Sequence, residues 1–184
     1  MIRVSLAQCL TVLLALSAPA AAGEPYRAGA FLHKKSVLLD ATPAEVWDAV
    51  TGDIGGWWDH KFSAGAPARF FIEARPGGGF WEYFDPEGLT GVRHAVVIFS
   101  NGRDRLVFDG PLGFNGHAVS IVTGYEITDL HDGKSRLDLS LSYAGAEQDG
   151  WRDAMIGVWD HFLSRLEGYL AAGCRGGGPC DAFP

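Results

Sequence analysis

This sequence of 184 residues has little positive charge. Its 15 basic residues are outnumbered by 22 acidic ones, giving a formal net charge of −7, and no basic cluster compensates. An acidic surface repels phosphate backbones and anionic headgroups, so nucleic acid is not an expected partner. The sequence also lacks a G-x-S-x-G elbow, a phosphate-binding loop, a dinucleotide fingerprint and a histidine pair with metal-ligand spacing. We therefore expect no cofactor and no metal site.

Long hydrophobic runs are absent apart from one near the N-terminus. Arg3 precedes an apolar run over residues 10–16, and alanine-rich cleavage sites follow at residues 18–20 or 20–22. This arrangement is typical of a secretory signal peptide, which we place at residues 1–22. The alternative is a membrane anchor, but the run is too short to span about 30 Å of hydrocarbon. We expect a periplasmic or secreted protein with no stable membrane insertion after signal cleavage.

Cysteine is scarce, with three residues in the chain, and Cys9 lies within the expected signal peptide. Cys174 and Cys180 lie in a C-terminal tail that we place at residues 173–184. In an oxidising compartment, an even pair separated by a glycine-rich stretch favours a disulfide. The alternative of a redox or metal pair lacks both C-x-x-C spacing and a neighbouring histidine.

The longest regular pattern lies near the C-terminus, between Asp149 and Leu170. Apolar residues recur there every three or four positions, which predicts an amphipathic helix of about 22 residues. Asp149 is the expected N-cap and Gly173 the expected C-terminal stop. So broad an apolar stripe must be covered by a large apolar surface. The stripe consists of Trp151, Met155, Trp159, Phe162, Leu166 and Tyr169.

The preceding residues predict one strand, two short helices and then six strands. A first strand is expected over residues 30–40. Thr42 and Glu45 form a capping box that starts a short helix, and residues 53–58 follow as a second short helix or turn. Segments of period two joined by short turns then predict an antiparallel meander. Its strands are expected at residues 69–74, 80–84, 92–100, 105–109, 119–130 and 135–144.

In this order the elements predict an α+β domain, in which a curved seven-stranded antiparallel sheet wraps around the C-terminal helix. The order is one part of a resemblance, and four local motifs are the other: residues 41–47, the pair Trp57-Trp58, residues 76–82 and residues 159–163. Through them the chain resembles the START-like, or helix-grip, superfamily (SRPBCC, Bet v 1-like). The similarity is to its Hsp90-ATPase-activator-homologue and polyketide cyclase-like branch.

This resemblance covers about residues 30–171 and implies a START-like domain at residues 23–172. It implies a cavity between sheet and helix that takes an apolar or aromatic small molecule. In some members of the superfamily, cyclisation or dehydration takes place there. An exported chain would not meet a cytosolic ATPase, so co-chaperone activity is not implied here.

Glu82 and His94 are the candidate catalytic residues. Glu82 shares a strand face with Phe80, so a cavity-facing orientation would desolvate it and make it an acid, a base or a ligand anchor. The alternative is a solvent-facing carboxylate, or one that pairs with Arg93 across a hairpin. His94 would project toward the same cavity as a group that titrates near neutral pH. An ordinary half-exposed strand histidine is the alternative that we favour for it.

The candidate ligand-binding residues are aromatic or apolar, because such side chains offer a flat ligand a large contact area. A filled core would explain them equally well. The tyrosines among them would offer hydroxyls to a polar end of the ligand. These residues are Trp58, Phe80, Tyr125, Tyr143, Trp151, Met155, Trp159 and Phe162.

Three functions follow from these residues. The first is an exported protein that binds a small hydrophobic ligand. The second is a cyclase- or dehydratase-like enzyme that uses Glu82 and His94 for proton transfer. The third is a structural or interaction module with a filled core. Because no arranged catalytic triad is evident, binding is favoured over catalysis.

Overall fold

The computed structural model describes residues 27–183, so the expected signal peptide and Cys9 lie outside the described residues. The fold is α+β, with a large antiparallel sheet and a long C-terminal helix. In chain order the elements are β1 (Ala28–Leu39), α1 (Pro43–Val50), β2 (Gly52–Asp53), β3 (Arg69–Ile72), β4 (Gly79–Tyr83), β5 (Gly91–Ser100), β6 (Arg105–Gly110), β7 (Val119–His131), β8 (Lys134–Ala146) and α2 (Trp151–Ala171).

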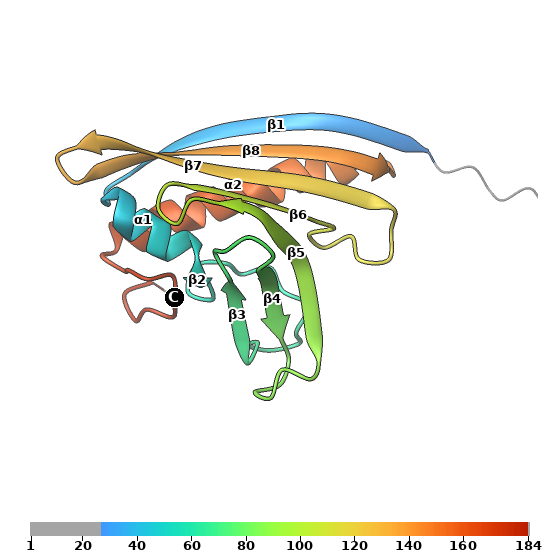
Figure 1. Cartoon of the computed structure of the whole chain (residues 1–184), viewed down its shortest axis with the longest axis horizontal. Helices are drawn as coiled ribbons and strands as arrows, with labels where there is room; N and C mark the ends of the chain where they lie inside the picture. The colour runs from blue at the N-terminus through green and yellow to red at the C-terminus, as the bar shows by residue number, and fades with distance from the viewer. Residues whose placement is uncertain (1–26, 184) are drawn as a thin grey trace, which may run out of the picture.

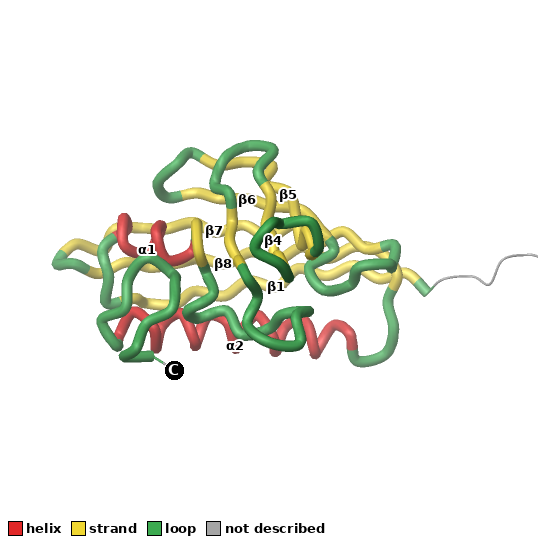
Figure 2. The backbone as a smooth tube through the Cα atoms, turned by 90° about the horizontal axis from the view of Figure 1, so that it is seen from below, coloured by secondary structure: helices red, strands yellow, loops and turns green. Residues whose placement is uncertain are grey.

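The strands lie side by side in the order β1-β8-β7-β6-β5-β4-β3-β2. From β2 to β8 this is the expected meander, with each strand paired to the next. The first strand joins the last, because β1 pairs along its whole length with β8, from Ala28 opposite Ala146 to Leu39 opposite Ser135. Helix α2 runs alongside the long strands β1, β7 and β8 (Figures 1 and 2).

Two expectations about the elements were wrong. The sheet has eight strands instead of seven, because Gly52 and Asp53 pair with β3 as the short edge strand β2. Of the two alternatives given for residues 53–58, the second short helix is wrong, and a turn follows β2 instead. The N–H of Ile54 donates to Phe70 in β3, while the N–H groups of the following tryptophans donate to the carbonyl of Ile54. A sheet edge and a turn thus satisfy the backbone groups that a helix would have used.

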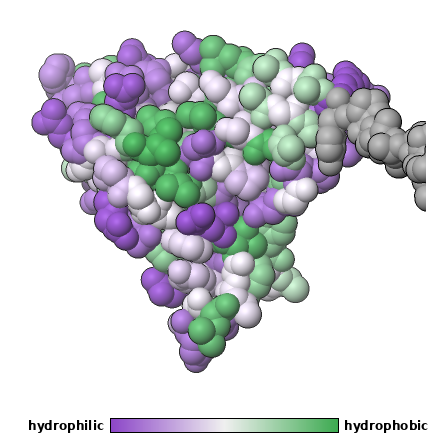
Figure 3. All heavy atoms as spheres, turned by 45° about the vertical axis from the view of Figure 1, so that its right-hand side comes forward, coloured by the Kyte–Doolittle hydropathy of each residue, from purple (hydrophilic) through white to green (hydrophobic). Residues whose placement is uncertain are grey.

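The sheet bends sharply along β5. Register shifts interrupt its pairing with β4 at Phe80/Trp81 and with β6 at Val97/Phe99, and such bulges bend a strand and increase its twist. As a result β3, β4 and one end of β5 turn away from the long strands as a separate arm (Figure 1). Figure 3 shows the tip of this arm, where hydrophobic residues lie among hydrophilic ones.

The two helices begin differently. The capping box of α1 is confirmed: Glu45 N–H donates to the Thr42 hydroxyl oxygen, and Thr42 N–H donates to the Glu45 carboxylate. Asp149 is not the N-cap of α2, because Gly150 takes that position in the left-handed region at φ 84°. The Asp149 carboxylate forms an ion pair with Arg27 instead.

The core lies between the concave face of the sheet and α2. The apolar stripe of the helix is buried except at its start, where Trp151 is half-buried. Inward-facing residues of β8 meet this stripe, and Leu137, Leu139 and Leu141 are each 2% exposed or less. The alternation predicted for this strand therefore produces one dry face.

Candidate functional site

A cavity of about 530 Å³ opens between the N-terminal half of α2 and the bend of the sheet. One wall is the helix face itself, whose contributing residues are spaced three and four apart and therefore lie on one side. The opposite wall comes from β4, β5 and two loops. The lining residues are Trp58, Asp59, His60, Lys61, Phe62, Phe80, His94, Leu112, Gly113, Phe114, Ala154, Met155, Val158, Trp159 and Phe162.

Aromatic packing fixes the wall next to the helix. The ring of Trp58 stacks on Phe162 with centroids 3.8 Å apart, and it meets Trp159 and Phe80 edge to face at 5.4 and 5.2 Å. Its indole N–H donates to the carbonyl of His60 at 3.0 Å. Trp58 thus attaches the segment after β2 to both the helix and the sheet.

Glu82 lies on β4, behind the wall opposite the helix, and does not line the cavity. Its side chain is fully buried on the inward face of β4, and its oxygens accept hydrogen bonds from the N–H groups of Phe62 at 2.9 Å and Ser63 at 2.7 Å. Nε2 of His94 lies 3.1 Å from the same carboxylate. The alternative partnership with Arg93 is wrong, because Trp81 is the residue opposite Arg93 and Glu82 lies opposite Val92.

These contacts set the ionisation of the pair. Burial raises the pKa of the Glu82 carboxyl, but the hydrogen bonds from Phe62, Ser63 and His94 together outweigh burial and hold the pKa below its ordinary value. Burial lowers the pKa of the His94 imidazole, and the nearby Glu82 carboxylate offsets this only in part. The favoured state at neutral pH is an ionised glutamate beside a neutral histidine.

That charge state fixes the tautomer of His94. A carboxylate can only accept, so Nε2 of a neutral His94 must carry the proton, and Nδ1 is then an acceptor. Among residues 27–183, Glu82 is the only hydrogen-bond partner of the His94 ring. The ring lines the cavity and packs against Phe80 with centroids 4.9 Å apart. The half-exposed histidine expected from the sequence is in fact 6% exposed.

The structure brings together five of the eight predicted ligand-binding residues at this cavity, and three lie elsewhere. Tyr143 donates its hydroxyl to the carbonyl of Ala146 and stacks on Phe31. Tyr125 is buried against Phe108 and Trp159, and burial raises the pKa of its phenol far above the ordinary value. Trp151 packs on Phe114 and His117. The five at the cavity are Trp58, Phe80, Met155, Trp159 and Phe162.

Sequence reasoning missed the two loops that complete the cavity. Residues 59–62 follow the Trp57-Trp58 pair without any periodicity, and the pair itself was the available signal that the next residues lie near the core. Residues 112–114 enter the wall because Leu112 N–H donates to the carbonyl of His94 at 3.2 Å. A contact between β5 and the residues after β6 has no local signature.

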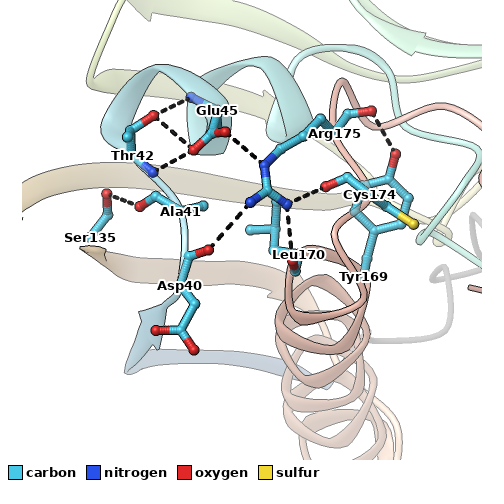
Figure 4. Close-up of polar contacts among 9 residues, drawn as sticks. All are labelled: Asp40, Ala41, Thr42, Glu45, Ser135, Tyr169, Leu170, Cys174 and Arg175. Atoms are coloured by element: carbon cyan, nitrogen blue, oxygen red, sulfur yellow. Dashed lines mark hydrogen bonds and ion pairs between the residues drawn. The ribbon is translucent and has the colours of Figure 1, made fainter. Parts of the chain in front are cut away.

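The C-terminal tail closes the other end of the helix. Cys174 and Cys180 form a disulfide, and the loop between them packs against the turn after β2, where Gly56 N–H donates to the carbonyl of Gly177 at 2.9 Å. The Arg175 guanidinium donates to the carbonyls of Leu170 and Cys174 and pairs with Glu45 at 2.8 Å (Figure 4). The tail is therefore built into the fold. No helix of the described residues is long and apolar enough to cross a membrane.

Comparison with solved structures finds other proteins of similar fold. No family model matches the sequence, and no curated protein matches it. An uncharacterized protein from Rhizobium leguminosarum is similar in structure with a TM-score of 0.63 and 17% identity, over 80% of this chain and 99% of that one. A Rhodobacter sphaeroides protein gives 0.54 and 19%, over 79% and 99%. A Rhizobium loti protein gives 0.53 and 19%, over 76% and 99%. At these identities the likeness shows a shared α+β fold.

Proposed function

We propose that this chain is an exported helix-grip protein that binds a small hydrophobic or aromatic molecule between its sheet and α2. The observation that carries the proposal is the cavity of about 530 Å³ with a largely aromatic wall. Small-molecule sites usually measure about 300–1,000 Å³ and are mostly apolar with a few placed polar groups. A module with a filled core would have no reason to keep such a space. The disulfide supports export, since such bonds persist in oxidising compartments.

His94 narrows the chemistry of the ligand. It is the buried polar side chain of the cavity wall, and its Nδ1 is an acceptor in the tautomer that Glu82 imposes. An apolar ligand with a hydroxyl or N–H group would donate to this nitrogen, whereas a purely hydrocarbon ligand would leave it without a partner. We therefore expect an aromatic or alicyclic molecule that carries one hydrogen-bond donor.

Fluorescence titration of the mature chain with naphthol and naphthalene tests both parts of the proposal. We expect both probes to bind, with naphthol tighter by about three- to tenfold, the worth of one net hydrogen bond. His94→Phe should remove that preference and keep naphthalene binding. Ala154→Trp, which fills the cavity from α2, should block both probes. Ala171→Trp is the matched control, because Ala171 is the exposed last residue of the same helix.

Each outcome of this titration bears on the proposal. If neither probe binds, or if Ala154→Trp leaves binding unchanged, the cavity is not a ligand site. If the wild type binds both probes equally, the assignment of Nδ1 as the ligand's acceptor is wrong.

Native mass spectrometry of the protein purified from its own host without detergent would reveal a carried ligand as excess mass that disappears on denaturation.

A second candidate function is a proton-transfer enzyme in the same cavity, and the Glu82–His94 contact is the observation that favours it. A carboxylate that orients a neutral imidazole leaves the other ring nitrogen ready to accept a proton from a bound molecule. His94 would then be the general base and Glu82 a positioning residue. For a ligand identified by mass spectrometry, turnover that His94→Phe abolishes, while the variant still binds that ligand, would favour the enzyme over the carrier.

A further inference from the structure

A cluster of two histidines and one aspartate lies at the edge of the cavity. Asp59 uses one carboxylate oxygen toward Nδ1 of His60 at 2.9 Å and the other toward Nε2 of His161 at 2.8 Å. The three ligand-type atoms all lie within 4.8 Å of one another. This cluster is separate from the Glu82–His94 pair, although Asp59 and His60 also line the cavity.

We propose that Asp59, His60 and His161 bind a divalent transition-metal ion, with zinc as the first choice. Two imidazole nitrogens and one carboxylate oxygen suit zinc and its neighbours, whereas calcium and magnesium prefer oxygen ligands throughout. Tetrahedral ligands about 2.0–2.2 Å from zinc lie about 3.3 Å apart. The contacts of 2.8 and 2.9 Å use different oxygens of Asp59, so one oxygen must face both imidazoles in the metal-bound form. Side-chain rotations must also bring the three ligand atoms, now within 4.8 Å of one another, to that spacing.

The surrounding packing positions these ligands in advance. His161 precedes Phe162 on α2, and Phe162 stacks on Trp58, which immediately precedes Asp59. The His60 ring also rests on Phe162, with centroids 5.2 Å apart. One aromatic contact therefore holds the loop ligands beside the helix ligand, which reduces the conformational entropy that metal binding would cost.

The charge near Asp59 and the number of protein ligands determine how this site would hold a zinc ion. Arg165 lies 3.6 Å from the carboxylate of Asp59 and also donates to the carbonyl of Trp57, so it orients the aspartate while reducing the net negative charge. Three protein ligands leave zinc at least one open position, the arrangement typical of zinc sites that exchange a ligand. The ion would then lie at the edge of the cavity and offer this position to a small donor molecule.

Calorimetric titration of the mature, untagged protein with zinc chloride tests the site. We expect one ion per chain, and His60→Ala and His161→Ala should each weaken binding at least about tenfold, since even residues outside the ligand shell commonly contribute 10- to 100-fold. His131→Asn is the matched control: His131 is the exposed last residue of β7, and asparagine tolerates its positive φ of 67°.

Cobalt chloride gives a second readout, because a visible ligand-field spectrum reports coordination by these side chains. Asp59→Asn keeps the size of the side chain and should change both that spectrum and the zinc affinity. Absence of one-to-one binding, or equal affinity in the wild type and His161→Ala, would overturn the proposal. Naphthol binding by metal-free protein is measured separately, so failure of the metal site and failure of the cavity proposal are distinguishable.

Discussion

The two ends of α2 use buried polar groups in different ways. At its C-terminal end, the hydroxyl of Tyr169 lies 2.9 Å from the carbonyl of Arg175 and 2.8 Å from that of Gly178, and Arg175 covers the last carbonyls of the helix. At the N-terminal half, Glu82 satisfies two loop N–H groups and His94, but no described residue satisfies the second nitrogen of His94. One end is closed by its own chain, and at the other end one histidine nitrogen has no partner among the described residues.

This difference separates polar groups that are bound within the chain from one that is not. Polar groups that find partners within the chain hold segments together, as the exposed Arg175 joins α1 to α2 through Glu45 (Figure 4). The second nitrogen of His94 has no hydrogen-bond partner among the described residues, yet it is not a fully buried atom, because Thr123 Oγ1 is the one buried side-chain nitrogen or oxygen left without a partner there. The four predictions below test whether the two ends are independent, beginning with the largest expected effect.

Glu82→Gln, beside the N-terminal half of α2, should cause the largest loss of stability among the variants predicted here. Glutamine can accept one of the loop N–H groups, but its amide nitrogen cannot accept from the other donors, so at least one buried hydrogen bond is lost. We expect the free energy of unfolding to fall by about 2–3 kcal/mol in urea denaturation. Glu126→Gln, an exposed glutamate on β7, should change it by less than about 0.5 kcal/mol. Equal effects in the two variants would contradict the anchoring role of Glu82.

The double substitution Cys174→Ala with Cys180→Ala should weaken the closed end and leave the cavity unchanged. The chain-entropy model assigns about 2 kcal/mol to a disulfide that closes so short a loop. Urea denaturation would measure this loss, and naphthol titration would measure the cavity. Loss of naphthol binding in a folded double variant would show that the two ends are coupled, contrary to the comparison.

Local signals predicted most of the fold. The period-two pattern over residues 135–144 predicted β8, and the capping box at Thr42 and Glu45 predicted the start of α1. Strand β2 was missed because its two residues are too few to show a period, and their partners in β3, Ile72 and Phe71, lie 20 and 18 residues further along the chain. The pairing of β1 with β8 brings the first and last strands of the domain together, and no local sequence pattern encodes it.

The site was less predictable than the fold because its contacts join segments that are distant in the sequence. Alternation alone placed Glu82 on the face of Phe80, which the structure bears out, since both are buried. The N–H groups that donate to Glu82 belong to residues 62 and 63, in a segment without periodicity. The sequence therefore did not predict that Glu82 anchors this loop. Likewise Asp59 and His161 are 102 residues apart in the sequence and meet only because Trp58 stacks on Phe162.

Tyr169→Phe should produce a smaller loss at the closed end. The hydroxyl has one proton for the two carbonyls within reach, so the substitution removes the equivalent of about one hydrogen bond, or about 1 kcal/mol. Urea denaturation would measure this loss. Because the hydroxyl holds the disulfide loop, reduction by dithiothreitol should also become faster. Tyr83→Phe, on the separate arm, is the control and should leave the reduction rate unchanged.

The smallest expected effect is a pH dependence at the closed end. The hydrogen bond from Arg175, followed by those from Thr42, lowers the pKa of Glu45 from 4.5 to about 2. Because the folded state holds this proton less tightly than the unfolded state, the stabilisation is complete above about pH 4.5 and is lost as the pH falls toward 2. Solvent screens this exposed pair, so the gain is modest. The stability difference between wild type and Glu45→Gln should therefore shrink over that window in acid titrations monitored by circular dichroism. A difference that stays constant from pH 6 to pH 2 would contradict a stabilising contribution from the Glu45–Arg175 ion pair.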